Sequence, residues 1–295
     1  MRNCLKPLLK YFFHLVLFFV VLDIVFSLIS SLSIRHKGSW IADFKNEKFD
    51  YIVLGNSRAF SAFDIKTIET ITNLKGVNLA VDAASPVEMS MIYEYFSKHN
   101  DFEHVILLID DKIIASKNYN KKAIKHFLPF MYTDYRDTFL SLNKREEFDI
   151  PLTFYIPFYR YVEYSSEIGL REVFLSVFAN SHRFDENGFK LLKPKKMSNK
   201  VTFSDDFTDN DNLNNLMSEI AMDNKNLIKV NLPYYSSIPI RLKDANEQYN
   251  VLDYTGYVND KSLFNDNIHL NMDGAKYFCT QFSKDLMNQL NINKL

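Results

Sequence analysis

A nearly unbroken apolar run near the N-terminus constrains the fold of this chain more than any other feature. The run extends from Tyr11 to Ile29 and reads YFFHLVLFFVVLDIVFSLI. A helix needs about 20 such residues to cross the hydrocarbon core of a bilayer. The sequence therefore predicts one N-terminal transmembrane helix, with residues 1–35 as a short cytoplasmic N-terminus and signal anchor and residues 36–47 as a linker.

The charges beside the apolar run indicate its orientation. Basic residues gather on the cytoplasmic side of membrane helices, and three of them precede the run, namely Arg2, Lys6 and Lys10. Arg35 and Lys37 follow the run and weaken this preference slightly. The rest of the chain is therefore expected outside the cytoplasm, in the periplasm or at the cell surface.

A cleaved signal peptide is the alternative to a permanent anchor. Ser31-Leu32-Ser33 offers small residues after the apolar run, in a pattern similar to a cleavage site. Cleavable signal peptides usually have apolar cores of roughly 7 to 15 residues, and this run is longer. An uncleaved anchor is therefore favoured, and both interpretations place most of the chain outside the cytoplasm.

Two ionisable residues, His14 and Asp23, lie within the apolar run. Such groups are costly in a membrane, and they often pair with a partner helix or serve a function. Asp23 lies toward the outer third of the span, where local hydration lowers the cost. Simple tolerance and pairing with a partner helix therefore both stay open.

Charge and cysteine usage exclude several classes of protein and site. The formal net charge is -1, and lysines alternate with acidic residues, so no basic surface for nucleic acid is expected. Cys4 and Cys279 fall on opposite sides of the predicted membrane and cannot pair. No Cys-x-x-Cys motif occurs, so neither a metal nor a cofactor is predicted, and Cys279 is expected to be a small buried apolar residue.

Segments typical of strands and of helices alternate from residue 48 onward. The predicted strands are 50–54, 76–80, 104–109 and 227–232, and the predicted helices are 59–72, 87–99, 212–226 and 272–290. Such alternation predicts an α/β domain with a parallel sheet that helices cover on both faces. The domain is expected to extend over residues 48–295.

A region rich in Phe and Tyr, at about residues 111–207, shows no such alternation and is predicted to be an insertion. Its densest part is PLTFYIPFYRYVEY, from Pro151 to Tyr164. It is either a helical insertion that covers the site or rests on the membrane surface, or an ordinary aromatic satellite core. Ser204 to Asn215 is typical of a polar linker or exposed loop.

Ser57 is the candidate nucleophile. It follows the first predicted strand in Gly55-Asn56-Ser57-Arg58, and the carboxyl ends of strands in open α/β sheets are where ligands bind. A serine hydroxyl needs a base within hydrogen-bond reach and donors for the developing oxyanion. The alternative is a plain turn in which Ser57 or Asn56 caps the next helix.

His269 is the candidate base, and Asp266 is the candidate residue that orients it. The two lie in DNIHLNMDGA, ahead of the last predicted helix. A carboxylate three residues before a histidine can hold the ring and stabilise the imidazolium, as the third member of a catalytic triad does. The alternative is a surface Asp-His pair that caps this helix.

These motifs resemble those of the SGNH, or GDSL-type, hydrolase superfamily, which is similar in having a serine after strand one and a final Asp-x-x-His. The resemblance implies a flavodoxin-like three-layer sandwich with a parallel sheet and gives the catalytic roles to Ser57, His269 and Asp266. More narrowly, the chain resembles membrane-anchored members associated with acylation of exported polysaccharides or with D-alanyl transfer in the teichoic acid pathway. It is similar to them in its N-terminal helix and in the motifs GNSR, Asn-Leu-x-x-x-x-x-Ser and DxxHLNxxGA. For these, the resemblance implies a membrane-bound O-acyltransferase as partner.

The chain departs from this family where oxyanion donors are expected. Ala83 stands where the second block, Asn78 to Ser85, would have glycine; its N–H is retained if the backbone conformation suits alanine. Asp110 follows the third strand where asparagine is expected, and an ionised carboxylate cannot donate a hydrogen bond. Asn78, Ala83 and Arg58 remain candidates for oxyanion or substrate contacts. Arg58 either faces an anionic substrate or is held in a salt bridge.

The sequence thus favours an extracytoplasmic serine acyl-esterase or O-acyltransferase, expected to handle acetyl groups on a cell-surface or exported polysaccharide. Water as acceptor gives an esterase, and a sugar hydroxyl gives a transferase. One alternative is a non-catalytic carbohydrate-binding or assembly subunit of a polysaccharide-modification complex. Another is a membrane-anchored lipase. Tyr234 and Tyr235 either stack on a sugar or close the sheet edge.

Overall fold

The computed structural model describes residues 2–33, 36–144, 151–178, 184–193, 203, 209–235 and 240–291. The chain divides into two compact units, each formed by two separate segments. A helical unit consists of Met1–Asp43 and Ile124–His182, and an α/β unit consists of Phe44–Ala123 and Arg183–Leu295. The insertion expected at 111–207 overlaps the second segment of the helical unit. The polar linker expected at Ser204 to Asn215 lies partly outside the described residues, and its end belongs to a helix.

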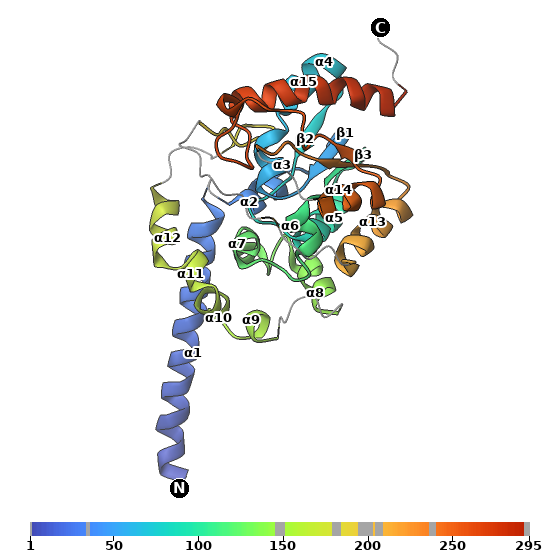
Figure 1. The fold of residues 1–295 in the computed structure, drawn as a ribbon. Coiled ribbons are helices and arrows are strands. Elements are labelled where there is room, and N and C mark those ends of the chain that lie inside the picture. The colour runs from blue at the N-terminus through green and yellow to red at the C-terminus, as the bar shows by residue number, and fades with distance from the viewer. Residues whose placement is uncertain are drawn as a thin grey trace. The chain divides into compact units, whose positions relative to one another are not determined.

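The α/β unit is built on a sheet of five parallel strands in the order β2-β1-β3-β4-β5 (Figure 1). The strands are β1 (Lys48–Leu54), β2 (Gly76–Asn78), β3 (Asp101–Leu108), β4 (Asn226–Asn231) and β5 (Leu252–Asp253). The last four residues of β1 and of β3 are fully buried, as expected for parallel strands with apolar runs. The predicted parallel α/β sheet is confirmed.

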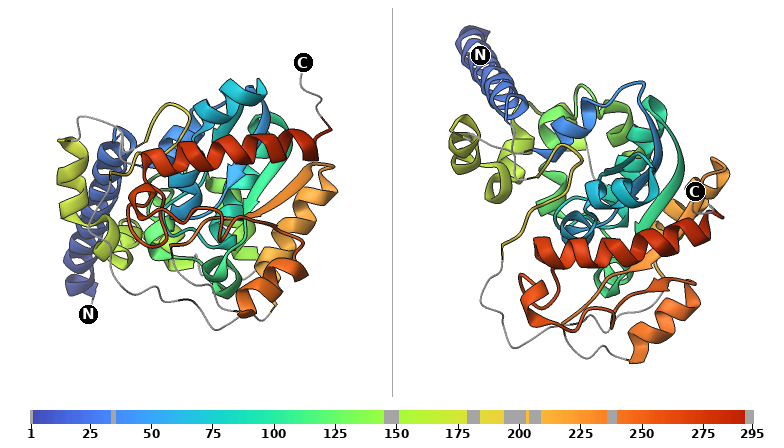
Figure 2. Two further views of the ribbon diagram at one scale, coloured as in Figure 1. Left: turned by 45° about the horizontal axis from the view of Figure 1, so that its top comes forward. Right: turned by 90° about the horizontal axis from the view of Figure 1, so that it is seen from above.

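Helices follow the strands of this unit. They are α3 (Ser57–Ala62), α4 (Ile65–Thr72), α5 (Pro86–His99), α6 (Asp111–Ala115), α13 (Asp211–Met222), α14 (Ile240–Gln248) and α15 (Met272–Gln289), with a 3-10 turn at Lys261–Leu263; the short α7 (Lys121–Ile124) crosses the boundary between the units. The C-terminal α15 packs on α3 and α4, and α13 packs on α5 (Figure 2). Buried rings of Phe63, Phe278 and Phe282 meet at 5.1–5.7 Å and form part of this core.

The predicted helix at 59–72 is two helices, because the chain breaks between α3 and α4. Phe63 leaves the helical conformation with a ψ of 91°, and Asp64 caps α4 by accepting hydrogen bonds from Thr67. Aspartate is a preferred helix cap, so Asp64 carried a signal for this break. Cys279 is buried beside the break, where its thiol donates to the Ala62 carbonyl, and the expectation of a small buried residue is confirmed.

The helical unit begins with α1 (Arg2–Ser31), followed by α2 (Lys37–Ala42), a 3-10 turn (Leu128–Phe130), α8 (Arg136–Lys144), α9 (Pro151–Tyr155), α10 (Tyr159–Glu163), α11 (Ser165–Ile168) and α12 (Leu170–Val177). Within α1, residues Lys6–Ser31 include an 18-residue window with a mean hydropathy of 2.6 and are long and apolar enough to cross a membrane. A signal sequence has the same properties. The predicted long apolar N-terminal helix is therefore confirmed.

Asp23 of α1 has its partner within the same chain. Its carboxylate accepts hydrogen bonds from Arg160 Nε at 3.1 Å and from Arg160 Nη2 at 2.8 Å. It also accepts one from the Phe158 N–H at 3.1 Å. The sequence left open a partner helix for Asp23, and the structure identifies it as α10 of the same unit.

Candidate active site

Ser57 lies at the first residue of α3, directly after the turn that ends β1. The turn needs glycine, because a Cβ atom on Gly55 would come within 2.5 Å of Ala59 and 3.0 Å of Leu108. Asn56 caps α3 by accepting a hydrogen bond from the Arg58 N–H at 2.9 Å. The expected cap at this turn is therefore Asn56, which leaves the Ser57 hydroxyl to point elsewhere.

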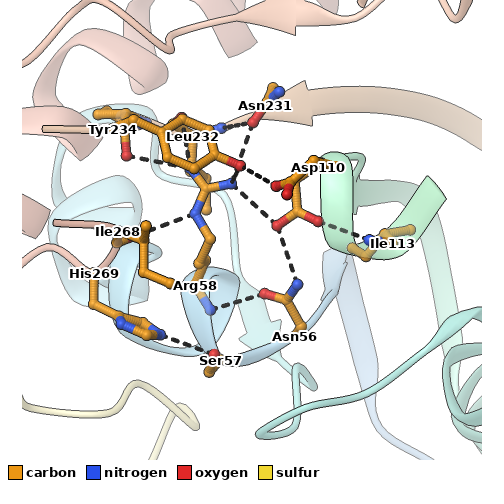
Figure 3. Close-up of polar contacts among 12 residues, drawn as sticks. Asn56, Ser57, Arg58, Asp110, Ile113, Asn231, Leu232, Tyr234, Ile268 and His269 are labelled. Atoms are coloured by element: carbon orange, nitrogen blue, oxygen red, sulfur yellow. Dashed lines mark hydrogen bonds and ion pairs between the residues drawn. The ribbon is translucent and has the colours of Figure 1, made fainter. Parts of the chain in front are cut away.

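The Ser57 hydroxyl forms a hydrogen bond with the imidazole of His269 (Figure 3). Ser57 Oγ and His269 Nε2 are 2.8 Å apart, although 212 positions separate the two residues in the sequence. On the other side of the ring, His269 Nδ1 lies 2.9 Å from both carboxylate oxygens of Asp266. The three predicted catalytic side chains thus form one continuous chain of hydrogen bonds.

A local turn holds Asp266 beside His269. Asp266 Oδ1 accepts hydrogen bonds from the backbone N–H groups of Ile268 at 3.0 Å and His269 at 2.9 Å. Partial burial raises the pKa of Asp266, but the hydrogen bonds from the His269 ring and these N–H groups outweigh that effect and hold the pKa below its ordinary value. The carboxylate is therefore ionised at neutral pH and fixes a proton on His269 Nδ1, which leaves Nε2 free to accept the serine proton.

The last predicted helix begins after this loop, and its first turn explains the remaining letters of the DNIHLNMDGA motif. Asn271 caps α15 by accepting hydrogen bonds from the N–H groups of Asp273 and Gly274. A Cβ atom on Gly274 would lie 1.9 Å from the Leu263 carbonyl oxygen, so only glycine fits there. Asn271, rather than the Asp266–His269 pair, therefore caps the helix.

Arg58 is buried behind Ser57, with 2 % of its side chain exposed. Its Nη1 forms an ion pair with Asp110 at 3.0 Å and donates to the Tyr234 hydroxyl at 2.6 Å (Figure 3). Its Nη2 donates to the Leu232 carbonyl at 2.7 Å, and its Nε donates to the Ile268 carbonyl at 3.2 Å. Of the two roles open from the sequence, the structure therefore favours the salt bridge.

Asp110 caps α6 and accepts hydrogen bonds from the first motif. Its Oδ1 accepts from the Ile113 N–H at 2.8 Å, and its Oδ2 accepts from Asn56 Nδ2 at 3.1 Å in addition to Arg58. A carboxylate can accept all three of these bonds, whereas an asparagine here would present a donor to Arg58 or Asn56. The carboxylate of Asp110, at the position where an asparagine was expected, is thus the partner of the arginine in the first motif.

Tyr234 belongs to this buried network rather than to a sugar-binding surface. Its ring stacks under the Arg58 guanidinium at 3.6 Å, and its hydroxyl donates to Asp111 at 2.8 Å. Burial raises its pKa well above the ordinary value, so the phenol stays protonated. Of the two expectations for Tyr234, closure of the sheet edge is the one that agrees with its burial.

The two other candidates for oxyanion or substrate contacts lie in different environments. Asn78 is fully buried, and its Nδ2 donates to the carbonyls of Ala59 at 3.0 Å and Phe63 at 3.2 Å. Its amide therefore stabilises the fold around α3. Ala83 has a φ of 62°, the left-handed conformation that favours glycine, and it lines a pocket beside Ser57.

This pocket has a volume of about 240 Å³, and Ser57, Ala83 and Ile268 form part of its wall. Among the described residues, neither the Ser57 N–H nor the Ala83 N–H has a hydrogen-bond acceptor. Both residues line the pocket, so their N–H groups are candidate donors to a group bound next to the serine hydroxyl. The wall also includes Lys112 and Asn120, which the sequence gave no reason to select.

Asn120 lines the pocket, and its backbone is held by the buried carboxyl group of Glu88. The Asn120 N–H donates to Glu88 Oε1, and the N–H and hydroxyl of Ser85 donate to Glu88 Oε2 at 2.8 Å and 2.6 Å. Complete burial raises the pKa of Glu88 to about 7, although these hydrogen bonds favour the ionised form. Ser85 and Glu88 form a capping box at the start of α5, a local pattern that gives no indication of the link to Asn120.

No cluster of three or more metal-ligating side chains occurs among the residues that the structure describes. The arrangement is suited to acyl transfer, since it combines a serine, a base, an orienting carboxylate and backbone donors. Comparison with the models of known protein families and with characterised proteins gives no match to this chain.

Proposed function

We propose that this protein is a serine acyl-esterase or O-acyltransferase whose nucleophile is Ser57. The observation that carries the proposal is the continuous hydrogen-bond chain from Ser57 Oγ through His269 to Asp266, with distances of 2.8 Å and 2.9 Å. Two residues from opposite ends of the sequence meet at hydrogen-bond distance, as a nucleophile and its base must.

The mechanism follows from this order of groups. His269 Nε2 takes the proton of the Ser57 hydroxyl as the oxygen attacks the ester carbonyl, and Asp266 stabilises the imidazolium that forms. The N–H groups of Ser57 and Ala83 border the space where the oxyanion develops, and the Asn120 amide is a third candidate donor. When the tetrahedral intermediate collapses, His269 returns the proton to the leaving alcohol, and the acyl group stays on Ser57 Oγ.

The second half of the reaction decides between hydrolysis and transfer. His269 then removes a proton from the acceptor hydroxyl, which attacks the acyl-enzyme and releases Ser57. Water as acceptor gives an esterase, and a sugar hydroxyl gives an O-acyltransferase. The pocket beside Ser57, at about 240 Å³, is suited to a short acyl group such as acetyl rather than to a long chain, which favours the esterase or transferase over a lipase.

We further propose that the α/β unit has the flavodoxin-like three-layer arrangement of the SGNH hydrolases. The strand order β2-β1-β3-β4-β5 is that of doubly wound flavodoxin-like sheets, which bind ligands where the order reverses, between β1 and β3. Ser57 follows β1 and Asp110 follows β3. The helix pairs α4–α15 and α5–α13 would form the two outer layers.

The substrate and location rest on the resemblance and on α1. The proposed substrate is an acylated cell-surface or exported polysaccharide, and the proposed partner is a membrane-bound O-acyltransferase. The apolar α1 would anchor the protein with the site on the extracytoplasmic side.

The test uses the full-length protein in detergent, treated with a fluorophosphonate that modifies activated serines. We expect stoichiometric labelling at Ser57, located by peptide mass spectrometry, and its loss in Ser57→Ala and in His269→Ala. Ser218→Ala, at an exposed serine of α13, is the matched control and should label normally. A folded wild type that is neither labelled nor active on short acyl esters, yet binds glycans, would support the non-catalytic binding subunit instead.

A further inference from the structure

Helix α12 presents its apolar side chains to the outside. Leu170, Phe174, Val177 and the adjoining Phe178 recur at helical spacing and therefore share one face. In a water-soluble domain such a face packs on the core. Here all four side chains are exposed, whereas Ser176 on the same helix is buried. The helix has the inverse of the ordinary amphipathic arrangement.

The same inversion extends to the helices that precede α12. Eight large apolar side chains between α9 and the end of α12 are 45–73 % exposed, and together they form what we call the apolar surface of α9–α12: Leu152, Tyr155, Ile156, Val162, Leu170, Phe174, Val177 and Phe178. Large exposed apolar surfaces mark sites of interaction with proteins or membranes. The question is which of these two covers it.

Contacts with α1 show that this segment is attached to the span itself. Within the helical unit, α12 packs along α1, and α10 contacts α1 through Tyr161 and Arg160 (Figure 1). The ring of Phe158 lies 4.9 Å from that of Phe26, and the Tyr161 hydroxyl lies 2.9 Å from Ser27 Oγ. The helices that carry the apolar surface of α9–α12 therefore pack on α1, which itself has exposed apolar side chains such as Leu28.

The contacts between α10 and α1 lie at a position along α1 that would be inside a bilayer if α1 spans it. At a rise of about 1.5 Å per residue, Asp23 lies about 12 Å before the end of α1 at Ser31. The 26 residues of Lys6–Ser31 form a helix about 39 Å long, against a hydrocarbon thickness of about 30 Å. If α1 spans the membrane, α10 meets it below the surface of one leaflet.

The polar groups of this segment are arranged as a membrane requires. Arg160 is 1 % exposed, and its donors reach Asp23, Ser27 Oγ at 2.6 Å and the Leu128 carbonyl at 2.8 Å. Charges inside membranes are tolerated when they are paired and turned away from lipid. The segment thus hides a satisfied ion pair against α1 and exposes apolar side chains outside it.

We propose that helices α9–α12 lie in the membrane leaflet crossed by the C-terminal half of α1, with their apolar surface against the lipid acyl chains. Attachment to α1 favours lipid over a protein partner, because a bilayer around α1 also meets the helices packed on it without a further component. The proposal concerns how the protein is embedded and is independent of the chemistry at Ser57.

The experiment uses tryptophan fluorescence of the full-length protein, purified alone and reconstituted in phosphatidylethanolamine–phosphatidylglycerol vesicles. The chain has one tryptophan, Trp40, which Trp40→Phe removes. In that background, Phe174→Trp on α12 is compared with Met222→Trp on α13 of the α/β unit, where Met222 is also exposed. Each variant is measured in two samples, one with ordinary lipids and one with lipids brominated on their acyl chains. Bromine quenches only tryptophans within contact distance.

We expect Phe174→Trp to emit at shorter wavelength and to lose at least half of its intensity in brominated vesicles. Met222→Trp should be unaffected by bromine and strongly quenched by aqueous acrylamide. Equal acrylamide quenching of both variants, with no effect of bromine, would overturn the proposal. So would a blue shift of Phe174→Trp that occurs only in native membranes or rises with protein density in the vesicles, since another protein or a second copy would then cover the surface.

Discussion

Each of the two units contains a buried arginine–aspartate pair, and the two pairs are closely alike. Arg58 and Asp110 are 3.0 Å apart with exposures of 2 % and 0 %, and Arg160 and Asp23 are 2.8 Å apart with exposures of 1 % and 11 %. Each guanidinium also stacks on a tyrosine ring, at 3.6 Å on Tyr234 and at 4.2 Å on Tyr132. The energetic cost of burying such a pair is high in both places.

The two arginines differ in what else they hold. Arg58 directly follows Ser57 in the sequence. Its guanidinium donates to backbone carbonyls of two loops, and one of these belongs to Ile268, the residue before His269. It therefore links the candidate nucleophile to the loop of the candidate base. Arg160 donates mainly to Asp23 and Ser27 on one helix face. The comparison indicates that an apolar pair can replace the second pair but not the first.

The largest effect is expected when the first pair is replaced by apolar residues, in Arg58→Met with Asp110→Leu. The Ile268 carbonyl and the Asn56 amide lose their partners, so the His269 loop is free to shift relative to Ser57. A misplacement of about 1 Å can reduce a rate by about 10². We expect the fluorophosphonate labelling rate of Ser57 to fall by at least this factor. A wild-type rate in a folded double variant would show that the Arg58–Asp110 pair does not position the His269 loop.

The second pair should tolerate what the first does not. Asp23→Ala alone leaves Arg160 as an unpaired buried charge, which costs about 3 kcal/mol of stability. Adding Arg160→Met should recover most of that loss, because an apolar contact replaces the ion pair. Limited proteolysis between α9 and α12 and thermal unfolding measure the effect, with Ser57 labelling expected at the wild-type rate throughout. No recovery in the double variant would show that this pair, too, fixes a geometry.

Glu88 is a further acidic side chain that is fully buried, and it has hydrogen bonds but, among the described residues, no cation partner. Its pKa is about 7 when folded and 4.5 ordinarily, so the folded state holds the proton more tightly. Its stabilising contribution is full below pH 4.5 and is lost as the pH rises through about 7. Between pH 4.5 and 7.5, denaturant unfolding of the wild type should show a loss on the order of 2–3 kcal/mol that Glu88→Gln does not show.

The smallest effect concerns backbone conformation, where each unit again provides one example. Ala83 has a φ of 62° in the α/β unit, and Phe158 has a φ of 67° in the helical unit. Ala83→Gly should stabilise the protein by about 0.5 kcal/mol, since the relief of strain exceeds the added freedom of the unfolded chain. Phe158→Gly should instead destabilise it, because the ring contacts with Phe26 are lost. A fall in melting temperature for Ala83→Gly would show that the alanine is not strained.

The sequence predicted what short-range chemistry determines. Gly55 at a strand end and the Asp266–His269 spacing are local patterns, and their positions in the structure agree with them. Strands and helices with strong periodicity, such as β1 and α15, were found within a few residues. The two-residue β5 and the mostly polar α14 were missed because neither carries an apolar period that stands out.

The sequence could not predict contacts between distant residues. It offered Arg58 a substrate or a salt bridge, and it offered Asp23 an unnamed partner, because 52 and 137 positions separate these residues from Asp110 and Arg160. The partner of a charged side chain is determined by how helices and strands that are distant in the sequence pack together. The role of Tyr234 depended on the same packing and was left open for the same reason.

The turn that joins Asp266 to His269 has a consequence for motion. Because the carboxylate bonds both the ring and the backbone of the same four-residue loop, the base and its orienting group move as one rigid piece. A displacement of this loop relative to α3 would therefore break the 2.8 Å hydrogen bond to Ser57 and leave the bond between Asp266 and His269 in place. If Ser57 is the nucleophile proposed above, its activation would then depend on the position of this one loop, while the imidazole keeps its tautomer.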